Sequence, residues 1–145
     1  MKLIITLVLG MFFFLNADAQ VINIPKATKD HFEKKYPDAR EVDWHNNLAN
    51  YEVKFRNKNG VHRAYYHMDG KWDFTETYIE KSQVPAAVTA SLAKSRFSNW
   101  KMESTSLVDN NKGQKLYRLE MKKGVEKMFV FYDKNGKEIK TSVTT

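Results

Sequence analysis

The stretch "IPKATKDHFEKKYPDAREVDW" (residues 24–44) has a counterpart later in the chain, "VPAAVTASLAKSRFSNWKMES" (residues 84–104). Each begins with an apolar residue and a proline, whose missing N–H costs nothing in the first turn of a helix. Every fourth position is then apolar or small, and these positions are Ile24, Thr28 and Phe32 in one copy and Val84, Val88 and Leu92 in the other. This spacing predicts a short amphipathic helix at the start of each copy. The first helix should end near Tyr36, because a residue that precedes a proline disfavours the helical region.

Beyond each predicted helix, the chain alternates as strands do. "YEVKFRNKNGV" (51–61) and "YRLEMKKGV" (117–125) place apolar side chains at every second position and charged ones between them. That alternation is typical of half-buried strands. "VHRAYYHM" (61–68) and "VEKMFVFY" (125–132) are apolar on both faces, which predicts strands inside a sheet.

Both copies also turn in the same way before their last strand. "HMDGKW" (67–72) and "YDKNGKE" (132–138) carry Asp and Gly between predicted strands, as hairpin turns require. With further strands at about 39–46 and 100–108, each copy contains a helix and then four strands. We predict an α+β fold, a tandem repeat of one N-terminal helix packed on a four-stranded antiparallel sheet. The repeats span residues 20–80 and 81–145, and the longer second copy places its extra residues in the polar loop "DNNKGQ" (109–114).

The first residues have the composition of a secretory signal. Lys2 precedes the apolar run "LIITLVLGMFFFL" (3–15), and small residues follow at Ala17 and Ala19. The run is shorter than the roughly 18 apolar residues that span a bilayer, so a retained membrane anchor is the weaker interpretation. We predict a signal peptide at residues 1–19, cleavage near Ala19, and a periplasmic or secreted protein.

Charge and cysteine content restrict the function further. The formal net charge is +7, and the chain has no cysteine, so stability must come from a hydrophobic core without disulfides. A basic excess favours acidic partners or anionic surfaces. The basic residues are scattered, however, and a solvated strand face explains them without any partner. Export argues against a nucleic-acid partner, and stable membrane insertion is not expected.

The order of elements, in tandem behind a signal peptide, resembles the PepSY-like and β-lactamase-inhibitor-protein-like family of exported bacterial proteins. The segments that carry this resemblance are "IPKATKDHFEKKYPDAREVDW", "YEVKF", "DGKW", "VPAAVTASLAKSRF" and "YDKNGKEI". The resemblance implies a small binding or inhibitory module that holds its target with a concave sheet face, and it brings no shared catalytic motif. The second copy departs from the pattern, because it lacks an aromatic–Pro pair after its helix.

Motifs for chemistry are weak. His62, His67 and Asp69 suggest a metal site, but His62 and His67 are five positions apart and so face opposite sides of a strand. "DKNGKE" resembles a calcium loop, yet the twelfth position from Asp133 is Thr144 instead of Glu. No nucleophile elbow or glycine-rich phosphate loop occurs. We therefore predict no catalytic residue, metal or cofactor, and no enzyme.

Aromatic residues are the better candidates for a functional surface. Most of them must form the core, but Trp44, Trp72 and Phe74 stand among polar neighbours. Aromatic residues are enriched at the energetic centres of interfaces. With Lys54, Arg63 and Lys71 beside them, they would suit an acidic protein or peptide.

The sequence therefore predicts an exported, non-enzymatic module that binds or inhibits a protein or peptide through its sheet surface. The alternative is a periplasmic accessory protein that binds a small anionic ligand or an envelope polymer through its basic excess. The two differ in their expected response to salt, because exposed charges are screened as ionic strength rises.

Overall fold

The computed structural model describes residues 23–143, so the predicted signal peptide at residues 1–19 lies outside the described residues. No helix in residues 23–143 is long and apolar enough to cross a membrane. The elements are α1 Lys26–Lys35, β1 Arg40–Asn46, β2 Asn50–Asn57, β3 Gly60–His67, β4 Trp72–Tyr78, the 3-10 helix η1 Lys81–Gln83, α2 Ala86–Ala93, β5 Lys101–Asn110, β6 Lys115–Lys123, β7 Glu126–Tyr132 and β8 Glu138–Val143.

The eight described strands form one antiparallel sheet in which the order in space equals the order in sequence. Strands β4 and β5 join, with Phe74 opposite Asn110 and Tyr78 opposite Ser106. The α+β class and the order of elements agree with the prediction, but two separate four-stranded sheets are not observed. Pairing β4 with β5 satisfies backbone groups that two separate sheets would expose at their edges.

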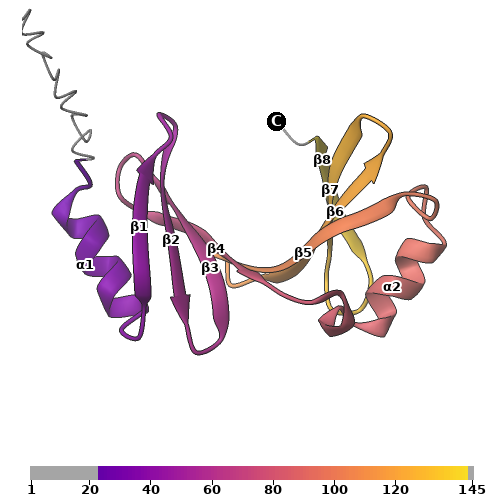
Figure 1. Ribbon diagram of the computed structural model, residues 1–145, viewed down its shortest axis with the longest axis horizontal. Coiled ribbons are helices and arrows are strands. Elements are labelled where there is room, and N and C mark those ends of the chain that lie inside the picture. Colours follow the sequence, from indigo (N-terminus) through magenta and orange to yellow (C-terminus); the bar gives the residue numbers. More distant parts are fainter. Residues whose placement is uncertain (1–22, 144–145) are drawn as a thin grey trace, which may run out of the picture.

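Two halves can be distinguished by their helices. We call α1 with β1–β4 the N-terminal half, and α2 with β5–β8 the C-terminal half. Figure 1 shows α1 and α2 at opposite ends of the molecule, with the twisted sheet between them and β4 and β5 crossing the middle.

The core of the N-terminal half lies between α1 and the sheet. The helix begins after Pro25 and ends before Tyr36, as predicted, and it buries Thr28 and Phe32. The Phe32 ring meets the Phe55 ring edge to face at a centroid distance of 5.0 Å. The buried side chains of this core are Ile24, Phe32, Tyr51, Val53, Phe55, Ala64 and Tyr66.

The core of the C-terminal half lies between α2 and the sheet in the same way. The helix begins after Pro85 and buries Val88, while Leu92 is only half-buried. The buried side chains of this core are Val84, Val88, Phe97, Leu119, Met121, Val130 and Tyr132. Each predicted helix therefore covers the apolar face of its own strands, and this burial, more than helix propensity, stabilises such short helices.

Both Asp/Gly turns pack against a helix. Gly70, in the β3–β4 turn, has φ +86°, and a Cβ there would lie 2.7 Å from Thr28 Oγ1. Gly136, in the β7–β8 turn, has φ +82°, and a Cβ there would lie 2.3 Å from the Ala87 carbonyl oxygen. Only glycine adopts this backbone at low cost and leaves room for the helix. The recurring turn is therefore where each helix contacts its sheet most closely.

The extra length of the C-terminal half lies partly in regular structure. Residues 109 and 110 were predicted to belong to a loop, but β5 continues through Asn110. The β5–β6 turn is short, and Asn110 Oδ1 accepts hydrogen bonds from the backbone N–H groups of Lys112 and Gln114. Strand β5 is longer than β1, and it pairs with strands on both sides, whereas β1 pairs on one side. Helix η1, which was not predicted, carries a capping box between Glu80 and Gln83.

Candidate functional site

One face of the sheet carries no helix in either half. Alternation along β6 directs Leu119 and Met121 toward the α2 core and Arg118 toward the opposite side. Cross-strand partners share a face. Thr77 in β4 is paired with Leu107 in β5, and Leu107 is paired with Tyr117 in β6, so the α1 side of β4 and the α2 side of β6 are the same side of the sheet. We call the opposite side the helix-free face.

The helix-free face has an apolar cluster of its own. Val108, Leu116 and Phe131 are buried there, and Phe74 and Phe129 pack against them half-buried. The cluster spans β4 to β7 and includes no helical residue. Tyr65 stacks on Phe74 at a centroid distance of 4.5 Å, and it extends the aromatic surface to β3. Phe74 and Phe129 therefore keep part of their apolar surface exposed on a sheet face that no helix covers.

A row of ion pairs crosses the same face. Glu52 and Arg63 form an ion pair, with Arg63 Nε 3.1 Å from Glu52 Oε1, and Lys54 Nζ lies 3.8 Å from the same oxygen. In the next strands, Glu76 pairs with Arg118. Glu76 is only 1% exposed. Burial raises the pKa of the Glu76 carboxyl, and the nearby Arg118 and Arg63 guanidinium groups oppose that shift.

Several buried polar atoms on this face have no hydrogen-bond partner among the described residues, and Arg63 Nε is one of them despite its ion pair with Glu52. Glu76 Oε2 and Ser106 Oγ are buried, and neither has a hydrogen-bond partner among the described residues. Ser106 pairs across the sheet with Tyr78 and Arg118, so it lies on the helix-free face. A buried polar atom without a partner costs about 1–3 kcal/mol and calls for an explanation.

A concavity lies over the apolar cluster. It has a volume of about 380 Å³, and we call it the hollow. Its lining residues are Asp73, Phe74, Glu76, Val108, Asn110, Asn111, Lys112, Leu116, Arg118, Phe129, Phe131 and Lys140. The hollow therefore combines aromatic walls, the buried carboxyl group of Glu76 and lysines at its margin.

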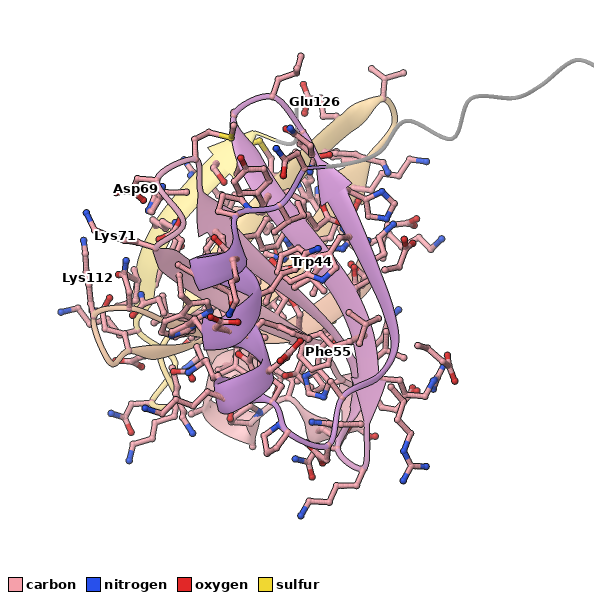
Figure 2. All side chains as sticks on the ribbon, turned by 90° about the vertical axis from the view of Figure 1, so that its left-hand side faces the viewer. Trp44, Phe55, Asp69, Lys71, Lys112 and Glu126 are labelled. Carbon is pink, nitrogen blue, oxygen red and sulfur yellow. The ribbon has the colours of Figure 1, made fainter. Side chains whose placement is uncertain are left out.

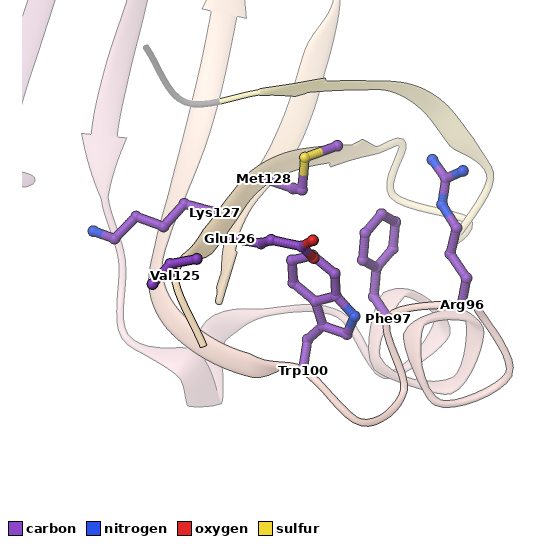
Figure 3. A pocket seen from close by; sticks show the side chains of 7 residues that line it. All are labelled: Arg96, Phe97, Trp100, Val125, Glu126, Lys127 and Met128. Carbon is purple, nitrogen blue, oxygen red and sulfur yellow. The ribbon is translucent and has the colours of Figure 1, made fainter. Parts of the chain in front are cut away.

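A larger concavity lies on the other side of the C-terminal half. It measures about 690 Å³ between the end of α2 and the β6–β7 hairpin, and we call it the α2 groove. Figure 3 shows Trp100 and Phe97 side by side in this groove, with Glu126 above the indole ring. Val125 stands at the tip of the hairpin and is 99% exposed. The described residues show no unpartnered buried polar atom lining this groove.

The structure brings three of the predicted site residues onto one face. Phe74, Arg63 and Lys54 all belong to the helix-free face through the contacts described above. Arg63 also donates from Nη1 to the Tyr65 hydroxyl over 3.5 Å.

The other three predicted residues lie elsewhere. Trp44 packs against Phe32 on the α1 side, and the Trp72 indole donates to Thr75 Oγ1 over 2.9 Å beneath Lys35. Lys71 lies in the β3–β4 turn and pairs with Asp69 at 2.8 Å. Figure 2 shows Trp44 beside α1 and Lys71 at the edge of the molecule.

Several residues of the helix-free face were not predicted as site residues. They are Tyr65, Glu76, Arg118, Phe129 and Phe131. The signal was present in "VEKMFVFY", whose second apolar series, Phe129 and Phe131, cannot face α2 together with Val130. A strand apolar on both faces, in a half with only one helix, must leave one apolar face open.

Metal-binding residues do not gather in residues 23–143, where no group of three His, Cys, Asp or Glu side chains is close enough to hold an ion. His62 faces the α1 side and is hydrogen-bonded to Thr77 and Asn57. His67 is at the other end of β3 from His62, and its Nε2 lies 3.6 Å from a carboxylate oxygen of Asp73.

Comparison with known proteins identifies similar sequences and folds. Residues 16–64 and 49–140 match the family described as "Putative beta-lactamase-inhibitor-like, PepSY-like". Solved structures share the fold, among them three proteins from Bacteroides species. A BLIP-like protein from Bacteroides fragilis NCTC 9343 has a TM-score of 0.74 at 18% identity, over 88% of this chain and 92% of that one. A DUF2874 family protein from Bacteroides uniformis ATCC 8492 has a TM-score of 0.73 at 20% identity, over 83% and 90%.

The third is a protein from Bacteroides eggerthii DSM 20697 described as "putative periplasmic", with a TM-score of 0.71 at 22% identity, over 83% and 89%. No curated protein matches the sequence significantly. At these identities the solved structures establish the architecture, and the matched family model covers most of the chain.

Proposed function

The chain belongs to the PepSY-like family, and from that premise we propose that it is an exported, non-enzymatic module that binds a protein or peptide. The partner lies against the helix-free face of the sheet. Inhibition of a hydrolase is the narrower form of this proposal, and the BLIP-like name of one relative supports it.

The observation that carries the proposal is the open apolar cluster on the helix-free face. Phe74 and Phe129 are half-buried although no helix covers them, and Tyr65 adds a third ring. Large apolar patches rimmed by polar groups mark interaction sites, and aromatic side chains dominate interface energetics. The ion pairs of this face balance the charges of Glu52 and Glu76 beside the cluster, and Lys112 and Lys140 add positive charge at its margin.

The non-enzymatic part of the proposal rests on how the charged groups of this face are engaged. Glu52 is held by Arg63, and Glu76 by Arg118. An acid or base for catalysis has to reach a substrate proton, whereas each of these carboxylates has one oxygen paired with a guanidinium group, and the second oxygen of Glu76 is buried in the free protein. Such pairs favour recognition by shape and charge.

Export completes the proposal. We propose cleavage of residues 1–19 near Ala19 and residence in the periplasm or outside the cell, which the "putative periplasmic" relative supports. The recurrence of helix, four strands and an Asp/Gly turn supports a duplicated unit, with residues 20–80 and 81–145 as its copies. The joined sheet then offers one surface to one partner.

The test is capture of the partner by residues 20–145 from the envelope fraction of the source cells. Truncating two rings with Phe74→Ala and Phe129→Ala should weaken capture at least about tenfold, because both rings lie at the centre of the proposed contact. Val125→Ala, which removes an exposed apolar side chain on the α2 groove, is the matched control and should retain capture. Urea unfolding checks that each variant is folded.

Other results would redirect the proposal. Capture lost in the Val125→Ala variant and kept in the double variant would move the contact to the α2 groove. Capture of a carbohydrate or small anion that disappears in high salt, equally in all variants, would favour the anionic-ligand alternative. Loss of capture in Trp44→Ala, Trp72→Ala or Lys71→Ala, with unchanged unfolding, would extend the surface toward α1.

A further inference from the structure

The hollow on the helix-free face has the chemistry of a pocket for one particular side chain. We propose that it takes a tyrosine of the partner, flanked by acidic residues. This inference rests on the proposed function, because it names the part of the partner that the helix-free face holds.

The walls of the hollow select an aromatic side chain. Phe74, Phe129 and Phe131 surround it, with Val108 and Leu116 beneath. Aromatic rings pack favourably edge to face or offset against one another, which a flexible aliphatic chain does not match. An aromatic side chain also loses few rotamers on binding.

A hydroxyl group on that ring would find a partner within the hollow. Glu76 Oε2 is a buried carboxylate oxygen without a hydrogen-bond partner, and Glu76 lines the hollow. A phenol can donate to this oxygen and accept from the Arg118 guanidinium group, which also lines the hollow. A ligand ammonium group is less suitable, because Arg118 already balances the charge of Glu76.

The donor has to displace part of the lining, because the oxygen is covered in the free protein. Phe74 and Phe129 are the half-buried rings of the hollow, so we expect rotation of one of these rings to expose the oxygen. Ring rotation on binding gives a signal separate from affinity, since it shifts the resonances of Tyr65, which stacks on Phe74.

The margin of the hollow selects the neighbours of the tyrosine. Lys112 and Lys140 are exposed there, and neither forms an ion pair within residues 23–143. Lys140 Nζ lies 4.3 Å from the centroid of the Phe131 ring, which keeps its charge at the entrance. Asp73 accepts a hydrogen bond from the Asn111 amide and contributes one negative charge, which the two lysines outweigh, so the net charge at the margin is positive. Acidic residues on either side of the tyrosine match it.

The test uses synthetic peptides and amide NMR spectra of residues 20–145. The probes are acetyl-Glu-Tyr-Glu-amide, acetyl-Glu-Phe-Glu-amide and acetyl-Lys-Tyr-Lys-amide. We expect shifts centred on the hollow, and the acidic tyrosine peptide should bind about tenfold more tightly than the phenylalanine peptide, because a hydrogen bond to a charged acceptor is strong. The basic peptide should bind several-fold more weakly than the acidic one at low salt.

Two variants sharpen the test. In Glu76→Gln the preference for tyrosine over phenylalanine should fall to about threefold, because a neutral amide accepts more weakly. Should that variant not fold, the exposed pair Lys112→Glu and Lys140→Glu tests the margin, and it should reverse the preference between acidic and basic peptides. Lys58→Glu with Lys94→Glu carries the same charge change elsewhere and should leave the preference unchanged.

Equal binding of the tyrosine and phenylalanine peptides would overturn the assignment of Glu76, and tighter binding of the basic peptide would overturn that of the margin. Shifts centred on Trp100 in the α2 groove would overturn the pocket itself. If the peptides ignore the hollow while Phe74→Ala with Phe129→Ala still abolishes partner capture, the proposed function stands and this inference fails.

Discussion

The two halves share one order of elements but fill the cores beneath their helices with different side chains. Beneath α1 the core is built on rings, with Phe32 contacting Tyr36, Trp44 and Phe55. Beneath α2 it consists mainly of Val, Leu and Met side chains. On the helix-free face both halves contribute rings and charged groups: Tyr65 and Phe74 with the Glu52–Arg63 pair in one half, and Phe129 and Phe131 with Arg118 in the other. The same order of elements therefore accommodates different core side chains, while the helix-free face is aromatic in both halves.

The largest difference should appear when equivalent helix residues are truncated. Phe32→Ala should cost about 3–5 kcal/mol of unfolding free energy, because it removes a ring from a fully packed site. Leu92 is at the matching position of α2 and is only half-buried, so Leu92→Ala should lower the unfolding free energy by roughly 1–2 kcal/mol. Urea unfolding of both variants measures this, and both should shift one common transition because the halves share one sheet. Equal losses would contradict the contrast between the cores.

The two turn glycines should differ next. Gly136→Ala forces a Cβ to within 2.3 Å of a backbone oxygen in α2, whereas Gly70→Ala meets a side-chain hydroxyl of α1. We expect about 3 kcal/mol of destabilisation for the former and 1–2 kcal/mol for the latter. Adding Thr28→Ala should recover part of the loss at Gly70, whereas Ser91→Ala should recover little at Gly136 because the Ala87 carbonyl remains. Thermal unfolding of the two single variants and the two double variants measures these losses and recoveries. Equal recovery at both glycines would rule out the steric explanation.

The smallest effect concerns two carboxyl groups of opposite behaviour. Burial raises the pKa of Glu76, so its contribution to stability is present below its unfolded pKa and is lost as pH rises through the folded value. A hydrogen bond from Ser104, with help from Lys127, lowers the pKa of Glu120, whose contribution is present above its unfolded pKa and is lost as pH falls through the folded value.

Substitution by glutamine should therefore change opposite limbs of the stability profile. Glu76→Gln should flatten the fall in stability on raising pH above about 4.5, the ordinary pKa of the group. Glu120→Gln should flatten the fall on acidification. The test is the slope of the unfolding free energy against pH, measured from pH 3 to 8 for each variant and for the unsubstituted protein. A shared sign for the two variants would show that one pKa direction is incorrect.

Helices and hairpins were predictable because their signals are local. Pro25 and Phe32 define α1 through their spacing, and Gly70 and Gly136 mark the turns that contact the helices. The β4–β5 pairing was not predictable, because polar residues such as Thr75 and Ser106 carry no local signal of which strand will pair with them.

The candidate site was predicted in part. Phe74 and Arg63 share a strand register with the open face, so alternation could place them. Polar neighbours in "DWHNN" say nothing about faces, and Trp44 packs toward α1 because that half has a helix to receive it. Glu76 and Arg118 meet only through the β4–β5–β6 register, which no short stretch encodes.

Strand order that equals chain order has a consequence for how the molecule forms. Each hairpin can form as soon as its own residues are available, because its strands are neighbours in the chain. The entropic cost of loop closure is therefore small at most steps. A polypeptide threaded end first through a translocation pore could assemble its ribbon progressively as it emerges. The exception is the β4–β5 junction, which has to wait for η1 and α2 between its strands, and it is there that we expect the rate of assembly to be set.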